Sequence, residues 1–199
     1  MIDRLELKNF TVFDKLKIDF SSKINVIIGE NGTGKTHLLK STYGLCSGAN
    51  LFKEKSDLGN KELVAKFDDK LVRLFMPMDS KVGKMHRRGS SEKASISACF
   101  NQDQQFAVTF SNRSKLKLVI DRNKFKSYQS RANFIPSKEI FSLIKGFGGK
   151  FNNLKTIESI FDDTYIDLSR VLMRKEYNSF EDKINSDPRL NSIIPKLVN

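Results

Sequence analysis

The chain has 199 residues, of which 39% are hydrophobic, and its formal net charge is +12. This length allows a buried core, organised as one domain with a subdomain. Two cysteines and two separated histidines exclude a disulfide framework and a clustered metal site, and no apolar run is long enough to span a bilayer. We therefore expect a cytoplasmic protein with no membrane segment.

The N-terminal part of the chain predicts three strands. Residues 2–8 and 16–20 alternate apolar and polar side chains, as half-buried strands do. Residues 24–28 read INVII, an apolar run that predicts a buried core strand. Two edge-like strands followed by a core strand therefore lead into the next segment.

Residues 29–36 read GENGTGKT and match the phosphate-loop pattern G-x-x-x-x-G-K-[ST]. Its glycines let backbone N–H groups surround a polyphosphate, and the N-terminus of the following helix adds partial positive charge. Lys35 would reach the β- and γ-phosphates, and the Thr36 hydroxyl would bind Mg²⁺. An ordinary glycine-rich turn is the alternative, which a strand before the loop and a helix after it disfavour. We predict that ATP and Mg²⁺ bind at Gly29, Glu30, Asn31, Gly32, Thr33, Gly34, Lys35 and Thr36.

Two helices and a loop are expected next. The first helix covers about residues 35–45, and Gly48 is its expected C-cap. Apolar spacing near 3.6 predicts an amphipathic helix over 61–75, which Pro77 closes. Residues 79–93 are charged, contain glycine and serine, and show no periodicity, which predicts a mobile loop.

The period changes to two at residue 94. Residues 95–100, 106–110 and 116–120 predict three strands of an antiparallel meander that covers about 94–121. Residues 132–135 predict a further core strand, ended by a proline. We expect an ATP-binding lobe with this β subdomain over residues 1–150, and a helical segment over 151–199 that leads into a missing C-terminal lobe.

The sequence shows the phosphate-binding half of an ATPase without its hydrolytic half. A Mg²⁺-binding acidic residue normally ends a second apolar strand. Asp121 after LVI is the nearest match, but Arg122 follows it, and the end of a surface strand is the better interpretation. The segment LCSGA at 45–49 only superficially resembles an ABC signature. The catalytic residues are therefore unknown, and we expect ATP hydrolysis by this chain alone to be near background.

Positive charge gathers in one segment. Residues 81–131 hold twelve lysines and arginines against three acidic residues. Such asymmetry favours contact with DNA or RNA, although basic loops are often only solvated. The candidate contacts are Lys81, Lys84, Arg87, Arg88, Arg113 and Lys115.

These features together resemble a known family. The N-terminal strands, Asn9-Phe10, the run 23–36 and the meander resemble the first lobe of ABC-type ATPases of the SMC/RecF class. Among these, the chain is most similar to prokaryotic AAA-family ATPases, including the overcoming-lysogenisation-defect (OLD) relatives of phage-defence systems. The segments FIPSKEI at 134–140 and FDDTYIDL at 161–168 also resemble that group.

The resemblance implies an α/β P-loop fold with an ABC-ATPase-like core, whose sheet is incomplete in this chain. It implies ATP held in a head-to-tail homodimer through a complementary C-terminal lobe, and an effector such as a nuclease or toxin subunit. Ser137, Lys138 and Glu139 follow the strand at which such ATPases place a γ-phosphate sensor. The usual glutamine is absent there.

Three functions were compared. The leading hypothesis is the ATP-binding lobe of an ABC-type ATPase that controls a DNA-associated or anti-phage effector. The alternative is a basic nucleic-acid-binding module that binds ATP without hydrolysing it. A P-loop kinase or GTPase is disfavoured, because the sequence has no Asn-Lys-x-Asp motif and the meander does not resemble a kinase lid.

Overall fold

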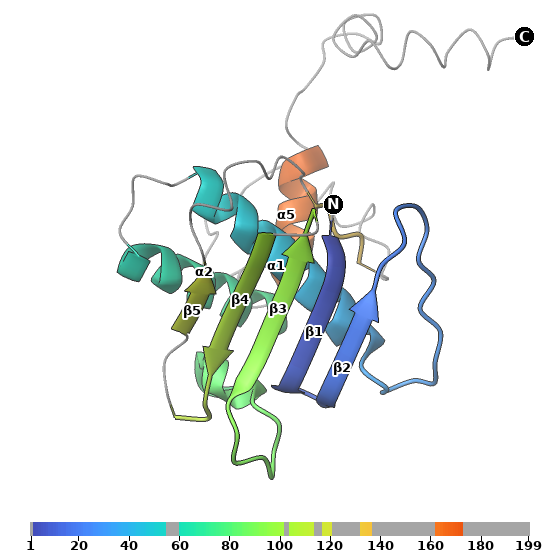
Figure 1. Ribbon diagram of the computed structural model, residues 1–199. Coiled ribbons are helices and arrows are strands. Elements are labelled where there is room, and N and C mark those ends of the chain that lie inside the picture. Colours follow the sequence, from blue (N-terminus) through green and yellow to red (C-terminus); the bar gives the residue numbers. More distant parts are fainter. Residues whose placement is uncertain are drawn as a thin grey trace, which may run out of the picture.

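A five-stranded antiparallel sheet with helices on one face forms the body of the computed structural model (Figure 1). The structure describes residues 2–54, 60–101, 104–113, 117–120, 132–136 and 162–172. The strands are β1 (Ile2–Phe10), β2 (Phe13–Asp19), β3 (Ala94–Phe100), β4 (Gln104–Phe110) and β5 (Lys117–Ile120). The helices are α1 (Lys35–Glu54), α2 (Asn60–Phe75) and α5 (Asp163–Leu172), with short 3-10 turns η1 (Met78–Ser80) and η2 (Val82–Met85).

The sheet has the strand order β2-β1-β3-β4-β5, and every neighbouring pair is antiparallel. The meander β3-β4-β5 therefore continues onto the N-terminal hairpin through β1. On β1, Leu5 and Leu7 are buried while the residues between and beside them are exposed, as the period of two predicts. The predicted strands at 2–8, 16–20 and in the meander are confirmed.

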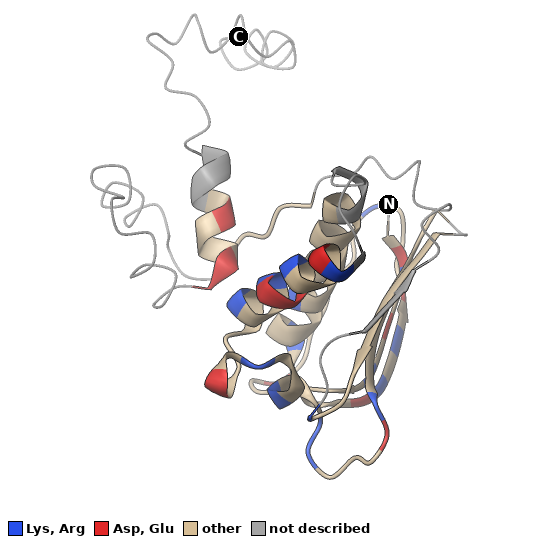
Figure 2. Ribbon diagram, turned by 90° about the vertical axis from the view of Figure 1, so that its left-hand side faces the viewer, with Lys and Arg blue, Asp and Glu red and all other residues tan. Residues whose placement is uncertain are grey.

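Helices α1 and α2 cover one face of the sheet, and α5 lies beyond them on the side away from the strands (Figure 2). The core between the layers is rich in aromatic rings. Phe67 of α2 meets Phe106 of β4 edge to face, with ring centroids 5.2 Å apart. The predicted helix at 61–75 is confirmed, with Phe75 as its last residue.

The expected helix end at Gly48 is wrong, because α1 continues to Glu54. A Cβ atom at Gly48 would lie 2.8 Å from ring carbons of both Phe67 and Phe106. Real Cβ atoms essentially never approach that closely. Gly48 is therefore a close-packing position inside the helix, where the ring pair crosses it.

The predicted core strand at 24–28 is also wrong in this structure. The segment forms no strand, and Ile24, Val26 and Ile28 are 84%, 80% and 87% exposed. Figure 1 shows it within a loop that extends away from β2. Asn25 forms local bonds instead: its Oδ1 accepts from Ser21 N at 2.8 Å, and its Nδ2 donates to Ser21 O at 3.1 Å. No described strand pairs with this segment.

The expected core strand at 132–135 is not formed either. Its residues have no strand geometry, and Ile135 is 79% exposed. Phe134 instead places its ring against Tyr43 of α1, with centroids 5.8 Å apart. The segment is held by this aromatic contact, since no described strand offers it a ladder of backbone hydrogen bonds.

Residues 79–93 are packed against the β1–β2 turn, which contradicts the prediction of a mobile loop. Val82 and Met85 are buried within η2. Thr11 N donates to Met85 O at 2.7 Å, and Arg87 N donates to Asn9 O at 2.9 Å. Val82 and Met85 are buried although only three positions separate them. A pair of apolar residues is too short to give a detectable period, so the sequence pattern did not predict this turn.

Some predictions lie outside the described residues. They concern Ser137, Lys138, Glu139, Lys115, Asp121 and most of the segment 151–199. Within the described part, no helix is both long and apolar enough to cross a membrane.

Candidate nucleotide-binding site

The phosphate loop ends where α1 begins, at Lys35. Gly32 and Gly34 adopt left-handed φ angles of +84° and +96°, which only glycine adopts without strain. A Cβ atom at Gly34 would lie 2.8 Å from the Phe13 ring and closer still to Val12. Gly34 is therefore needed both for the loop conformation and for the close contact with the β1–β2 turn.

Bonds within the loop hold its positive charge in place. The Lys35 ammonium donates to Gly29 O at 2.7 Å and to Glu30 O at 2.6 Å. The Thr33 hydroxyl donates to Glu30 O at 2.8 Å, and Thr36 is exposed on the first turn of α1. An ammonium beside a helix N-terminus is the arrangement that binds a phosphate group. The structure thus brings the predicted residues 29–36 together.

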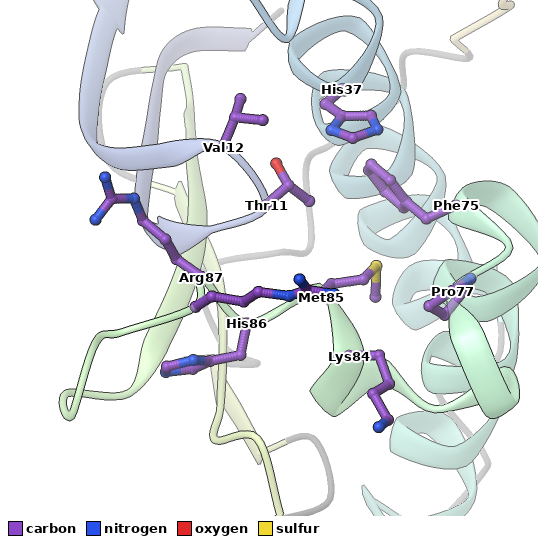
Figure 3. A pocket seen from close by; sticks show the side chains of 10 residues that line it. Thr11, Val12, His37, Phe75, Pro77, Lys84, Met85, His86 and Arg87 are labelled. Carbon is purple, nitrogen blue, oxygen red and sulfur yellow. The ribbon is translucent and has the colours of Figure 1, made fainter.

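A cavity of about 580 Å³ opens beside this first turn (Figure 3). It lies between the β1–β2 turn, α1, the end of α2 and the segment after η2. Its walls combine apolar and basic side chains, from Thr11, Val12, His37, Phe75, Pro77, Lys84, Met85, His86, Arg87 and Arg88. A concave site with apolar walls and a few polar groups is typical of small-molecule binding.

Two polar atoms of cavity-lining residues have no hydrogen-bond partner among the described residues. They are Thr11 Oγ1 and His37 Nδ1, and both atoms are buried. Figure 3 shows the Thr11 hydroxyl on the side of the turn that faces the His37 ring. Thr11 also has a φ of +50°, a strained conformation for a β-branched residue. Buried polar atoms without partners cost free energy, so these two groups are an unfavourable feature of the cavity wall.

The surroundings of His37 favour its neutral form. Burial lowers the pKa of its imidazole, and the nearby Lys40 ammonium lowers it further. Its ring stands edge to face against Phe75, with centroids 5.7 Å apart. The neutral imidazole presents an unprotonated or singly protonated nitrogen, rather than a cation, to the cavity.

The basic residues predicted from the sequence fall into two groups. Lys84 and Arg87 line the cavity and pair with Asp79 and Asp14, each at 3.4 Å. Arg88 lines the cavity as well. The other two described candidates, Lys81 and Arg113, are exposed, and neither forms an ion pair within the described residues.

Sequence reasoning did not predict seven of the cavity residues: Thr11, Val12, His37, Phe75, Pro77, Met85 and His86. They come from segments far apart in the chain, and no spacing pattern connects them. The left-handed backbone at Thr11 has no signature in the residue type. Within the described residues, no group of His, Cys, Asp and Glu side chains could hold a metal on its own.

Comparison with known proteins identifies the family. A model described as the AAA ATPase domain matches residues 1–199. The chain belongs to the AAA ATPase domain family. This confirms the predicted membership of P-loop ATPases, and the ATPase family implies nucleotide binding.

Curated relatives of this AAA ATPase domain include the DNA replication and repair protein RecF of Bacillus cereus (strain G9842) and of Bacillus thuringiensis (strain Al Hakam). Each is 33% identical over 90 residues, which cover 45% of this chain and 21% of the relative. The match thus spans about a fifth of these relatives' length. A solved chain described under "Structural biochemistry of ATP-driven dimerization and DNA stimulated activation of SMC ATPases" aligns with a TM-score of 0.41 and 18% identity. That alignment covers 63% of this chain and 75% of the other.

Proposed function

We propose that this chain is the ATP-binding lobe of an ABC-type ATPase. The triphosphate of Mg·ATP would bind in the loop 29–36, and the nucleoside would enter the adjoining cavity. One observation carries the proposal: a phosphate loop with the required glycine conformations leads directly into α1, whose third residue, His37, lines a partly apolar cavity. The family match supports it.

Each part of the site suits one part of the nucleotide. Lys35 and the N-terminus of α1 would neutralise phosphate charge, and Thr36 would give its hydroxyl to Mg²⁺. His37 is the next residue and lines the cavity. The apolar walls of the cavity, which include Val12 and Phe75, would then receive the base.

Further parts of the ATPase would complete this lobe. The exposed apolar side chains of Ile24, Val26, Ile28 and Ile135 favour strands that are supplied by a C-terminal lobe. We propose that this lobe also brings the catalytic residues, and that two copies enclose ATP head to tail. A cytoplasmic complex that controls a DNA-associated or anti-phage effector, such as a nuclease or toxin, is the function that the resemblance favours.

A glycine pair in the chain offers a sharp test of the phosphate loop. Gly34→Ala and Gly89→Ala both place a side chain at a left-handed φ, +96° and +82° respectively. Only the Gly34 Cβ would meet neighbours, and nothing lies within 4 Å of the Gly89 Cβ. We expect calorimetry to show at least about tenfold weaker Mg·ATP binding for Gly34→Ala, and little change for Gly89→Ala. Equal affinities in the two variants would contradict the proposal.

Nucleic-acid binding is a second candidate function. Lys81 and Arg113 are exposed, form no ion pair within the described residues, and do not line the cavity. If they contact phosphates of duplex DNA, a plot of log affinity against log salt concentration should have a negative slope. Removing one contact should make that slope less steep by about 0.9.

The matching experiment compares two double variants in filter binding to duplex DNA at several salt concentrations. Lys81→Ser with Arg113→Ser removes two charges from the proposed contact, while Lys15→Ser with Lys23→Ser removes two exposed charges elsewhere. The first pair should reduce both affinity and salt slope, and the second should change them little. If the parent chain binds no DNA at low salt, the basic segment is only a solvated surface.

A further inference from the structure

Helix α5 is attached to α1 and α2 through charged side chains. Lys70 Nζ lies 3.0 Å from Asp163 Oδ2, and Arg73 Nε lies 3.0 Å from Asp163 Oδ1. Lys70 also pairs with Asp167, which accepts a hydrogen bond from the Tyr43 hydroxyl as well. Three carboxylates of the α5 segment thus face three cations of α1 and α2, counting the pair described next.

Lys40 joins the three helices at a single ammonium group. Its Nζ donates to Asp162 Oδ2 at 2.7 Å and to Leu74 O at 2.9 Å. Leu74 belongs to the last turn of α2, whose carbonyl groups carry partial negative charge. Asp162 precedes α5, and its Oδ1 accepts from Thr164 N at 2.9 Å as an N-cap. One cation therefore connects the C-terminus of α2 to the N-terminus of α5.

These charges are partly or fully buried: the side chains of Lys40 and Asp162 are each 14% exposed, and that of Arg73 is 35% exposed. The Asp163 side chain is 3% exposed and that of Lys70 is 13% exposed. Burial lowers the pKa of the Arg73 guanidinium, but the neighbouring Asp163 and Asp69 carboxylates outweigh this effect and leave the pKa raised. Removing one member of a buried pair leaves the other charge uncompensated, so each link matters more than a surface ion pair would.

Lys40 also lies close to the phosphate loop along α1. It follows Thr36 by four residues, which places both on the same face of the helix, one turn apart. Asp162 thus holds α1 one turn below the residue that would bind Mg²⁺. A shift of the first turn of α1 on nucleotide binding would therefore move one partner of this contact.

We propose that α5 is a charge-held strap on the phosphate-loop helix, and that ATP binding and α5 docking strengthen each other. This coupling rests on the proposed function, because it requires ATP at residues 29–36. Thermodynamic linkage makes the effect reciprocal: a docked α5 raises ATP affinity, and bound ATP holds α5 in place.

The test uses Asp162→Asn, since asparagine keeps a side-chain oxygen for the N-cap but loses the charge that faces Lys40. Glu62→Gln is the control, because it removes an exposed pair with Lys66 on α2. Amide hydrogen exchange over residues 162–172 and calorimetry with Mg·ATP are the measurements. In Asp162→Asn we expect about fivefold or faster exchange in α5 and about fivefold weaker ATP binding. Glu62→Gln should match the parent in both.

The outcomes are separable. If α5 amides exchange at the same rate in Asp162→Asn as in the parent, the proposal that this charge holds α5 on α1 is wrong. If the parent binds Mg·ATP but its α5 amides exchange no more slowly with ATP, the coupling is overturned while the proposed function stands. If the parent binds no ATP, the proposed function and the coupling are both wrong. Comparing α5 exchange between the parent and Asp162→Asn without ATP then tests whether the ion pair holds α5. If amide exchange in Asp162→Asn is also faster in β3 and β4, the variant is globally destabilised. The same exchange measurement on Lys40→Gln, which removes the same ion pair from the α1 side, then tests whether the pair holds α5.

Discussion

His37 lies where the phosphate loop, the cavity and the α5 attachment meet. It lines the cavity, follows Thr36, and has its pKa lowered by burial and then by Lys40. A histidine kept neutral by its surroundings resists protonation in the folded state only. That difference between the folded and unfolded chain makes stability depend on pH.

The sign of this dependence follows from linkage. The folded pKa of His37 lies below its unfolded value of about 6.5, so the unfolded chain binds a proton first as pH falls. The stabilisation is complete above about pH 6.5 and is lost as pH falls toward the folded pKa. We expect urea unfolding midpoints of the parent to drop more steeply below pH 6.5 than those of His37→Gln. Parallel curves for the two proteins would show that His37 does not contribute.

At the scale of the element, α1 is built around two glycines with different surroundings. A Cβ at Gly48 would lie 2.8 Å from ring carbons of Phe67 and Phe106, which are both fully buried. A Cβ at Gly44 would lie 3.1 Å and 3.3 Å from methyl groups of Leu74 and Leu71. Leucine methyl groups can move by a few tenths of an ångström, whereas a packed ring pair has little room.

This contrast predicts different outcomes for the same substitution at the two positions. Alanine is favoured over glycine in a helix by about 1 kcal/mol, but overpacking a core costs about 1–3 kcal/mol. Gly48→Ala should therefore lower the free energy of unfolding by up to about 2 kcal/mol. Gly44→Ala should leave it within about 0.5 kcal/mol of the parent. Chemical denaturation measures both, and a Gly48→Ala variant as stable as Gly44→Ala would contradict the packing described.

The spacing of apolar residues along the chain predicted most of the strands and helices. The five strands follow a period of two, and α2 follows a period near 3.6. The run 24–28 has the composition of a core strand, but a strand also needs a neighbour, and Asn25 bonds to Ser21 instead. The loop 29–36 was predicted because its residues are contiguous. The cavity was not, since Thr11 and Phe75 meet only after folding.

At the scale of the whole molecule, the described chain is a sheet with helices on one face and a phosphate loop at its side (Figures 1 and 2). Exposed apolar side chains lie in the segments 24–28 and 132–136, at Ile24, Val26, Ile28 and Ile135, and also at Val12, Leu39, Met76 and Met78. The site therefore combines a formed phosphate loop and cavity with two segments that carry largely exposed apolar side chains. This division agrees with our proposal of a lobe that binds ATP and receives its catalytic groups from another lobe.

The most direct test of the central claim is calorimetric titration of Mg·ATP into the parent chain, Lys35→Ala and Lys23→Ala. Both variants remove one lysine charge, but only Lys35 donates to the carbonyl groups of the phosphate loop, whereas Lys23 is exposed outside it. Charge-assisted hydrogen bonds contribute about 1.5–3 kcal/mol, so Lys35→Ala should bind ATP about 10–100-fold more weakly. Lys23→Ala should bind like the parent. Unchanged affinity in Lys35→Ala would contradict the assignment of residues 29–36 as the ATP site.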